Sequence, residues 1–267
     1  MIFNKDLLFI HIGKTGGMSC SHYLLQNLQR PVYNCHYEAK NEAKKLKLDG
    51  IIPMPDIFRH CTLAEALDYI KQLNGMQLND FAKVVAVIRH PFTLEYSFYK
   101  HLQKPKVRER RKNKPRLLEL ADGDFKTFVA EAEYHRKGHT QDDFVRLGNE
   151  IPSSVELVKF EQLISAFPAA VSPFTKKTGL HPFPHHNRTD YHSEIHKELT
   201  SAVIEAIYQK HRFMFDSGLY SITDLPAKNY ANLNSKKRRP LLPSISLPIK
   251  RGIKAAYTKF RITDNDK

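Results

Sequence analysis

The stretch that most constrains the fold is residues 7–30, near the N-terminus. Residues 7–12 read LLFIHI, an apolar run typical of a buried strand. The sequence GKTGGMS follows at 13–19, and residues 21–30 then carry apolar side chains at helical spacing, with Pro31 expected to end the helix. The stretch therefore predicts a strand, a glycine-containing turn and a helix.

The turn has the chemistry of an anion-binding loop. Gly16 and Gly17 allow the backbone to turn tightly and to approach a ligand closely. Backbone N–H groups at the start of the following helix point at whatever lies there. Lys14 adds a positive charge, and Thr15 and Ser19 add hydroxyl donors. The loop is predicted to bind a phosphate-like group; the alternative is an ordinary turn with an exposed lysine.

The loop does not have the spacing of a nucleoside-triphosphate P-loop. That motif requires a glycine five residues before its Gly-Lys pair, and for Gly13-Lys14 this position is Leu8. KTGGMS after a strand instead resembles the phosphosulfate-binding loop of sulfotransferases, usually PKTGGTS in the carbohydrate branch of that family. Gly13 stands in place of the proline, and Met18 in place of the threonine.

A second motif follows the strongest strand of the chain, FAKVVAVIRH at 81–90. The run VVAVI predicts burial on both faces, as in a parallel sheet. Arg89 ends this strand, and Pro91 suits the first turn of a helix that carries Ser97 nearly two turns in. In open α/β sheets ligands bind beyond the carboxyl ends of the strands, and a guanidinium can bond two phosphate oxygens. Arg89 and Ser97 are therefore candidates for holding one phosphate group.

RHPFTLEYSFY resembles the 3′-phosphate motif of sulfotransferases, with serine eight residues after the arginine. VELVKFEQL, TGLHPFPHHNRT and AIYQKHRFMFDSGLY resemble later segments of the same family. The likeness covers about residues 7–220 and is closest to the carbohydrate branch, which includes heparan sulfate 2-O-sulfotransferases. It implies the sulfotransferase fold, an α/β fold with a P-loop-like central parallel sheet flanked by helices.

The resemblance also implies an activity: transfer of a sulfuryl group from 3′-phosphoadenosine 5′-phosphosulfate (PAPS) to an acceptor hydroxyl on a carbohydrate. 3′-Phosphoadenosine 5′-phosphate (PAP) would be the product, and no metal is needed. The resemblance assigns Lys14, Thr15, Gly16, Gly17 and Ser19 to the 5′-phosphosulfate, Arg89 and Ser97 to the 3′-phosphate, and Asn187, Arg188 and Thr189 to a cover over the nucleotide. Lys14 would also act in catalysis, at the bridging oxygen.

A general base should take the proton of the acceptor hydroxyl, and histidine titrates in the right range. His60 ends a candidate strand at 56–60, and Thr62 follows as the start of a helix-capping box. This placement puts His60 at the same sheet edge as the glycine loop, and FRHCTLAE loosely matches the base-bearing strand end of the resembling family. His60 is the predicted catalytic base, with His185 and His186 in reserve.

Elsewhere the chain alternates between candidate strands and helices, which favours an α/β fold. Further strands are predicted at 32–36 and in 154–163, and further helices at 38–50, 62–74, 124–138 and 193–215.

The positive charge is concentrated in two segments. The formal net charge is +14, of which 100–116 contribute +8 and 228–267 contribute +9. Residues 1–227 are predicted to form the sulfotransferase domain and 228–267 a basic C-terminal extension. Basic segments attract anionic polymers and membrane surfaces. The first is expected to guide an anionic glycan and the second to contact an anionic membrane surface or polymer; the alternative, favoured for the second, is a solvated segment without a partner. No specific nucleic-acid module is recognised.

Two other functions stay open at the level of sequence: a nucleotide kinase or other NTPase, and a polyanion-binding protein without catalysis. The N-terminus lacks the features of a secretory signal and no stretch has the length of a membrane span, so a cytoplasmic location is expected. The acceptor, the sulfated position and the oligomeric state are not determined by the sequence.

Overall fold

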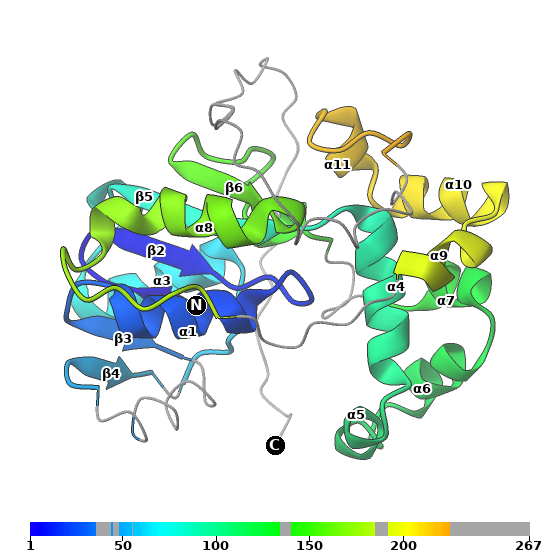
Figure 1. The fold of residues 1–267 in the computed structure, drawn as a ribbon, viewed down its shortest axis with the longest axis horizontal. Helices are drawn as coiled ribbons and strands as arrows, with labels where there is room; N and C mark the ends of the chain where they lie inside the picture. The colour runs from blue at the N-terminus through cyan, green and yellow to red at the C-terminus, as the bar shows by residue number, and fades with distance from the viewer. Residues whose placement is uncertain (36–43, 45–47, 55, 134–139, 185–191, 225–267) are drawn as a thin grey trace. The chain divides into compact units, whose positions relative to one another are not determined.

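The apolar run at 7–12 forms a strand, β2 (Leu7–Ile10), inside a six-stranded sheet (Figure 1). This computed structural model describes residues 1–35, 44, 48–54, 56–133, 140–184 and 192–224. The other strands are β1 (Ile2–Phe3), β3 (Val32–Asn34), β4 (Ile51–Pro53), β5 (Lys83–Ile88) and β6 (Val155–Lys159). The predicted α/β class, a central sheet flanked by helices, is confirmed.

The sheet has the order β4-β3-β1-β2-β5-β6. Strands β2, β5 and β6 pair in parallel, as do β3 and β4, whereas β1 runs antiparallel to both of its neighbours. Sequence analysis did not predict β1. The turn from β1 to β2 is held by Asn4, whose Oδ1 accepts hydrogen bonds from the backbone N–H groups of Asp6 (3.0 Å) and Leu7 (2.8 Å).

The helices cover both faces of the sheet or extend beyond it. They are α1 (Gly17–Asn27), α3 (Leu63–Asn74), α4 (Pro91–Leu102), α5 (Pro105–Arg110), α6 (Pro115–Asp122), α7 (Phe125–Glu131), α8 (Leu163–Val171), α9 (His192–Glu198), α10 (Ser201–Lys210) and α11 (Arg212–Asp216). Short 3-10 turns lie at Leu78–Asp80, Asp142–Phe144, Phe160–Gln162 and Ser172–Phe174. None of the described helices is long and apolar enough to cross a membrane.

Alternate residues of the central strands pack into two cores. On one face Leu8, Ile10, Val84 and Ala86 pack with residues of α3, α4 and α7. On the other face Leu7, Phe9, Val85 and Val87 pack with residues of α1 and α8. All five residues of the run 84–88 are buried, so the predicted burial on both faces is confirmed.

The prediction of a strand at 56–60 is wrong. This segment is a turn, in which the carbonyl of Phe58 accepts a hydrogen bond from the N–H of Cys61. The strand lies earlier, at β4, where it pairs with β3 at the edge of the sheet. An edge position tolerates Pro53, which lacks an N–H. The candidate helix at 38–50 falls largely outside the described residues.

Three predicted helices have different bounds from those expected. The first begins earlier, at Gly17, and ends at Asn27 rather than at Pro31. The candidate at 124–138 is helical to Glu131 within the described residues. The candidate at 193–215 is divided into α9, α10 and α11, because the Thr200 hydroxyl caps a new helix start at Val203 N. The capping box of Thr62 is confirmed.

A buried ionic cluster fixes α4 against α10. Glu95 of α4 is fully buried, and its carboxylate lies 2.7 Å from His211 Nε2 and 3.2 Å from Lys210 Nζ. Lys210 Nζ also donates to the carbonyls of Val129 and Ala132, at the end of α7. Burial raises the pKa of Glu95, but Lys210 and His211 outweigh it and hold that pKa below its usual range.

We expect Glu95→Leu to lower the free energy of unfolding by about 3 kcal/mol, because it leaves the Lys210 ammonium without its counter-ion. The double variant Glu95→Leu/Lys210→Met should recover much of this loss, since the partly buried ammonium of Lys210 is then removed as well. Urea denaturation at pH 7 measures both. Lys112→Gln, which removes an exposed ion pair with Glu109, is the control and should change stability by less than about 0.5 kcal/mol. Equal losses in the single and double variants would contradict the prediction.

Candidate functional site

The loop between β2 and α1 has the tight turn that its sequence predicts. Lys14 (φ 62°) and Gly16 (φ 83°) have left-handed backbone conformations, and Gly16 is the N-cap of α1. The Thr15 hydroxyl donates to the carbonyl of Ile12 at 2.8 Å, which closes the turn. The loop thus holds Lys14 at the carboxyl end of β2 and directs the start of α1 toward the same place.

Both glycines of the loop also pack closely against neighbouring side chains. A Cβ atom at Gly17 would lie 2.0 Å from the imidazole of His11, and one at Gly16 would lie 2.6 Å from the side chain of Leu163. Real Cβ atoms do not approach neighbours this closely. The pair therefore serves the fold directly, besides any role in the approach of a ligand.

Arg89 connects the two sequence motifs. It follows β5, and its guanidinium donates from Nη1 to the carbonyl of Lys14 (3.1 Å) and from Nε to Thr93 Oγ1 (3.0 Å). Its guanidinium carbon lies 4.3 Å from the centre of the Phe160 ring. The structure therefore brings Lys14 and Arg89 together, as the sequence predicts.

Gln141 fixes the backbone of Arg89 and was missed by sequence reasoning. Its side chain accepts from the N–H of Arg89 and donates to the carbonyl of Arg89, both at 2.7 Å. Gln141 is fully buried in a segment that has no motif of its own. The backbone N–H and C=O of Arg89 thus bind the Gln141 amide, where a neighbouring strand would otherwise supply their partners.

The loop lies in a strongly positive environment. Burial together with the nearby charges of Arg89, Lys104 and Arg111 lowers the pKa of Lys14 to about 7. Burial and the charge of Arg59 also lower the pKa of Arg111. We call the set Lys14, Arg59, Arg89, Lys104, Arg110 and Arg111 the cationic cluster. Like charges held this close favour a bound anion, because an anion removes their mutual repulsion.

His101, at the last turn of α4, lies within the field of this cluster. Burial and the charges of Lys14, Arg111, Lys104 and Arg110 lower its pKa to about 3. The sequence predicts for 100–116 only a role in guiding glycans, and no motif singles out this histidine. Its spacing could have identified it, because His101 lies one helical turn after Ser97, four residues along the chain.

His60 does not lie on a strand, but it does contact the glycine loop region. Its Nδ1 is 3.0 Å from the carbonyl of His11, and the two rings meet edge to face with centres 4.7 Å apart. A carbonyl only accepts, so Nδ1 carries the hydrogen and Nε2 is the basic nitrogen of the neutral ring. His60 is therefore linked through His11 to Gly17.

The other predicted residues are placed as follows. Ser19 is buried in the first turn of α1, and Ser97 is buried on α4, one turn beyond the Thr93 that contacts Arg89. Arg188, with Asn187, Thr189, His185 and His186, lies outside the described residues. Within the described part of the chain, no three His, Cys, Asp or Glu side chains gather as a metal site would require.

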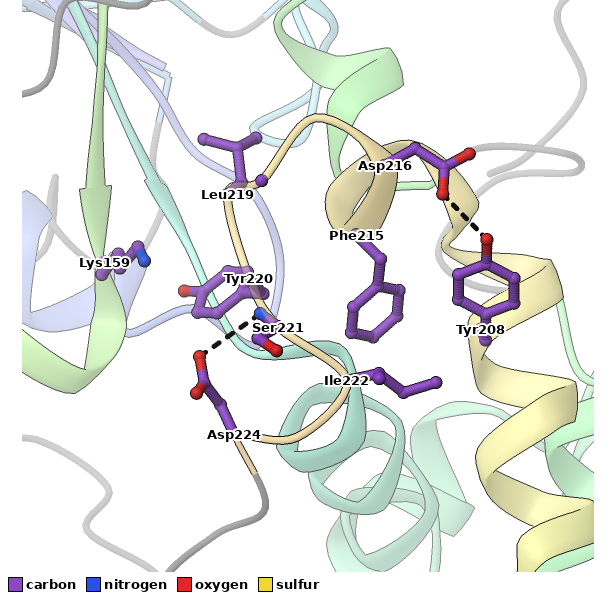
Figure 2. Close-up of a pocket in the computed structure, with 10 residues that line it drawn as sticks. Lys159, Tyr208, Phe215, Asp216, Leu219, Tyr220, Ser221, Ile222 and Asp224 are labelled. Carbon is purple, nitrogen blue, oxygen red and sulfur yellow. Dashed lines mark hydrogen bonds between the residues drawn. The ribbon is translucent and has the colours of Figure 1, made fainter.

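A separate hollow of about 440 Å³ lies near the end of the described chain (Figure 2). Its lining includes Lys159, Phe215 and Tyr220. The Tyr220 hydroxyl donates to Glu161 (2.8 Å), and the Lys159 ammonium lies 4.7 Å from the centre of the Tyr220 ring. None of the predicted site residues lines this hollow, and its contacts join the ends of β5 and β6 to the last described segment.

No family model matches the chain, and no curated protein matches it. Among solved structures, a sulfotransferase from Alicyclobacillus acidocaldarius is similar over 78% of this chain and 95% of that chain, with 13% sequence identity and a TM-score of 0.32. A likeness at this level assigns neither a family nor a function.

We expect Gly17→Ala to lower the free energy of unfolding by about 1–3 kcal/mol, because the new methyl group would overlap the His11 ring. The double variant Gly17→Ala/His11→Ala should be less destabilised than the sum of the two single variants. Gly123→Ala is the control, since a Cβ atom there meets nothing closer than 3.6 Å. Thermal or urea unfolding measures all four proteins. Simple additivity of the two changes would contradict the packing argument.

We expect Lys14→Met to stabilise the free protein by about 1–2 kcal/mol at pH 6, because it removes a charge that is buried and is also repelled by Arg89, Lys104 and Arg111. The folded-state pKa of Lys14 is lowered, so the cost of its charge is full below pH 7 and disappears as the pH rises toward 10.5. The advantage of the variant should therefore shrink between pH 7 and pH 10. Urea denaturation at pH 6 and pH 9.5 checks this, and an advantage independent of pH would contradict it.

Proposed function

We propose that the chain is a sulfotransferase that moves the sulfuryl group of PAPS to an acceptor hydroxyl. The observation that carries this proposal is the hydrogen bond from Arg89 to the carbonyl of Lys14. It joins a KTGGMS loop and an RHPFTLEYS helix start, each of which resembles a different half of a sulfonucleotide site. The cationic cluster around them fits a donor that carries several negative charges.

The positions of the glycine loop and of Arg89 indicate which residues would hold the donor. Lys14 and the backbone N–H groups at the start of α1 would bind the 5′-phosphosulfate, with Thr15, Gly16, Gly17 and Ser19 shaping the loop. Arg89 and Ser97 would bind the 3′-phosphate. Arg89 has five N–H donors, so it can bind an anion while it keeps its contact with Thr93. Arg188 remains a proposed contact of the nucleotide.

Lys14 has the properties that sulfuryl transfer needs at the leaving group. Negative charge develops on the oxygen that bridges sulfur and phosphorus as the bond breaks, and a fixed cation there lowers the barrier. The pKa of Lys14 is about 7 without an anion. A bound anion favours the ammonium form, so Lys14 would be charged when the donor is present.

His60 is the proposed base for the acceptor hydroxyl. The carbonyl of His11 fixes the tautomer that leaves Nε2 basic, which is the form that can take a proton. The same hydrogen bond also fixes the orientation of the His60 ring. The proton of the acceptor hydroxyl would pass to Nε2 as the new oxygen–sulfur bond forms and the bond to the leaving phosphate breaks.

For the acceptor we propose a carbohydrate hydroxyl on a molecule that can itself be anionic. The support is the position of the segment after α4: the charges of Lys104 and Arg111 act on Lys14, so the first basic segment borders the proposed reaction site.

We also propose that residues 1–227 form the sulfotransferase domain and that residues 228–267 form a basic extension. The extension would contact anionic surfaces.

Calorimetric titration with PAP, and with ADP as the control nucleotide, tests the donor site. We expect PAP to bind at least tenfold more tightly than ADP, because only PAP places a phosphate at Arg89. Lys14→Met and Arg89→Lys should each weaken PAP binding roughly tenfold or more, since the first removes a charge and the second the planar fork. Lys126→Gln, exposed on α7, should bind PAP like the wild type.

Equal affinity for PAP and ADP would contradict the assignment, and magnesium-dependent ATP hydrolysis would favour an NTPase instead. Loss of PAP binding in Lys14→Met cannot be attributed to unfolding if that variant is more stable at pH 6. Transfer of labelled sulfate from PAPS to a panel of glycans would then test the acceptor, with His60→Gln expected to lose transfer and keep PAP binding.

A further inference from the structure

The backbone at the end of β5 is held by side chains rather than by neighbouring strands. The pairing of β5 stops at Ala86 on the side of β2 and at Ile88 on the side of β6. Beyond these points the backbone N–H and C=O groups need other partners, because a buried polar group without one is costly. The Gln141 amide binds both backbone groups of Arg89, and two further side chains bind the residues on either side of it.

These two side chains are those of Glu161 and Tyr220. Glu161 Oε1 accepts a hydrogen bond from the N–H of His90 at 2.9 Å, and Glu161 Oε2 accepts one from the Tyr220 hydroxyl at 2.8 Å. The same hydroxyl also donates to the carbonyl of Ile88, at 3.2 Å. Tyr220 is buried. The pair therefore bridges the residue before Arg89 and the residue after it.

The residues next to this pair hold the Arg89 side chain and the start of α4. Phe160 places its ring 4.3 Å from the guanidinium carbon of Arg89. The carbonyl of Ser221 lies 3.2 Å from His90 Nε2 and can only accept, so Nε2 carries the hydrogen. His90 is the N-cap of α4. One turn after β6 and the last described segment thus enclose the end of β5 from two parts of the chain.

We propose that Glu161 and Tyr220 are positioning residues for Arg89, and that anion affinity depends on the docking of residues 219–224 through Tyr220. This inference rests on the proposed function for the identity of the ligand. A guanidinium binds two oxygens of one phosphate only in a defined orientation, which the backbone beneath it must fix. A side chain that is already fixed also loses less conformational freedom when the anion binds.

The variant Tyr220→Phe tests this role, because it removes the hydroxyl and keeps the ring beside Lys159. In calorimetric titration of the full-length protein we expect PAP to bind about three- to tenfold more weakly, the loss typical of one hydrogen bond. ADP binding should change less, since ADP brings no 3′-phosphate to Arg89. The preference for PAP over ADP should therefore shrink, whereas a merely structural role would lower stability and leave this ratio unchanged.

Tyr208→Phe is the matched control. Tyr208 lines the same hollow, and its hydroxyl donates to Asp216 at 2.8 Å, away from the end of β5 (Figure 2). This variant loses a tyrosine hydroxyl and one hydrogen bond, as Tyr220→Phe does. It should bind PAP and ADP like the wild type.

Two variants of Glu161 decide the matter if Tyr220→Phe does not fold. Glu161→Leu removes both acceptors and should weaken PAP binding at least as much as the loss of the hydroxyl. Glu161→Gln should recover most of the affinity, because its carbonyl can accept from the N–H of His90 and its NH₂ group can donate to the Tyr220 oxygen. PAP affinity that is equally weak in both variants, or unchanged in Glu161→Leu, would overturn the positioning role.

Nuclear magnetic resonance of the free protein supplies a measurement that needs no nucleotide. The Arg89 Nε–H donates to Thr93, and its signal is identified by its absence in Arg89→Lys. We expect this hydrogen to exchange with solvent several-fold faster in Tyr220→Phe than in the wild type or in Tyr208→Phe, because the guanidinium is held less firmly.

The outcomes separate this inference from the proposed function. If PAP binds, and Tyr220→Phe changes neither the preference for PAP nor the exchange of the Arg89 hydrogen, or only one of them, the inference is overturned while the donor site stands. If PAP does not bind, the proposed function fails, and titration with inorganic sulfate replaces it. Weaker sulfate binding together with faster exchange in Tyr220→Phe would then support positioning at a site for another anion, and any other result would overturn it.

Discussion

The parallel pairing of β2 with β5 is the constraint on which the rest of the site depends. The register places Leu8 beside Val84 and Ile10 beside Ala86, so both strands end at the same edge of the sheet. The chain beyond each end must then turn within a short distance of the other. This is why the carbonyl of Lys14 lies within reach of a guanidinium that is far away in sequence. A shift of the register by one residue would move both strand ends and would also reverse the faces of the sheet.

The site that results is electrostatically costly. Lys14 and Arg111 are partly buried beside other cations, and the pKa values of both are lowered. The fold offsets this cost through the two cores that enclose the strands. Repulsion among these cations destabilises the free protein. The same cations attract an anion, because the anion supplies a counter-charge to all of them. The stability of the loop and its affinity for anions are therefore expected to oppose each other.

Helix α4 is held in place next to the candidate site by contacts at its start and in its middle. Its first turn is capped by His90, whose Nδ1 accepts from the N–H of Phe92, and its middle is held by the buried carboxylate of Glu95. Gln141 fixes the backbone of Arg89, the residue before this cap. These contacts approach from different parts of the chain, so α4 has little freedom to rotate about its axis. Thr93 in the first turn of α4 is thus held where it contacts the Arg89 guanidinium, which in turn contacts the loop of Lys14.

The sequence by itself determined the elements whose signals are local. The glycine loop, the strand before Arg89 and the capping box at Thr62 depend on periodicity and on hydrogen bonds between near neighbours. Pairing over long distances could not be read in the same way, so β1 was missed and a strand was placed at 56–60 instead of β4. Short edge strands form where a partner offers free hydrogen bonds, and that depends on the whole sheet. Only the tertiary structure decided that His101 and Arg111 share the field of Lys14, because the electrostatic environment of a side chain depends on distances in space.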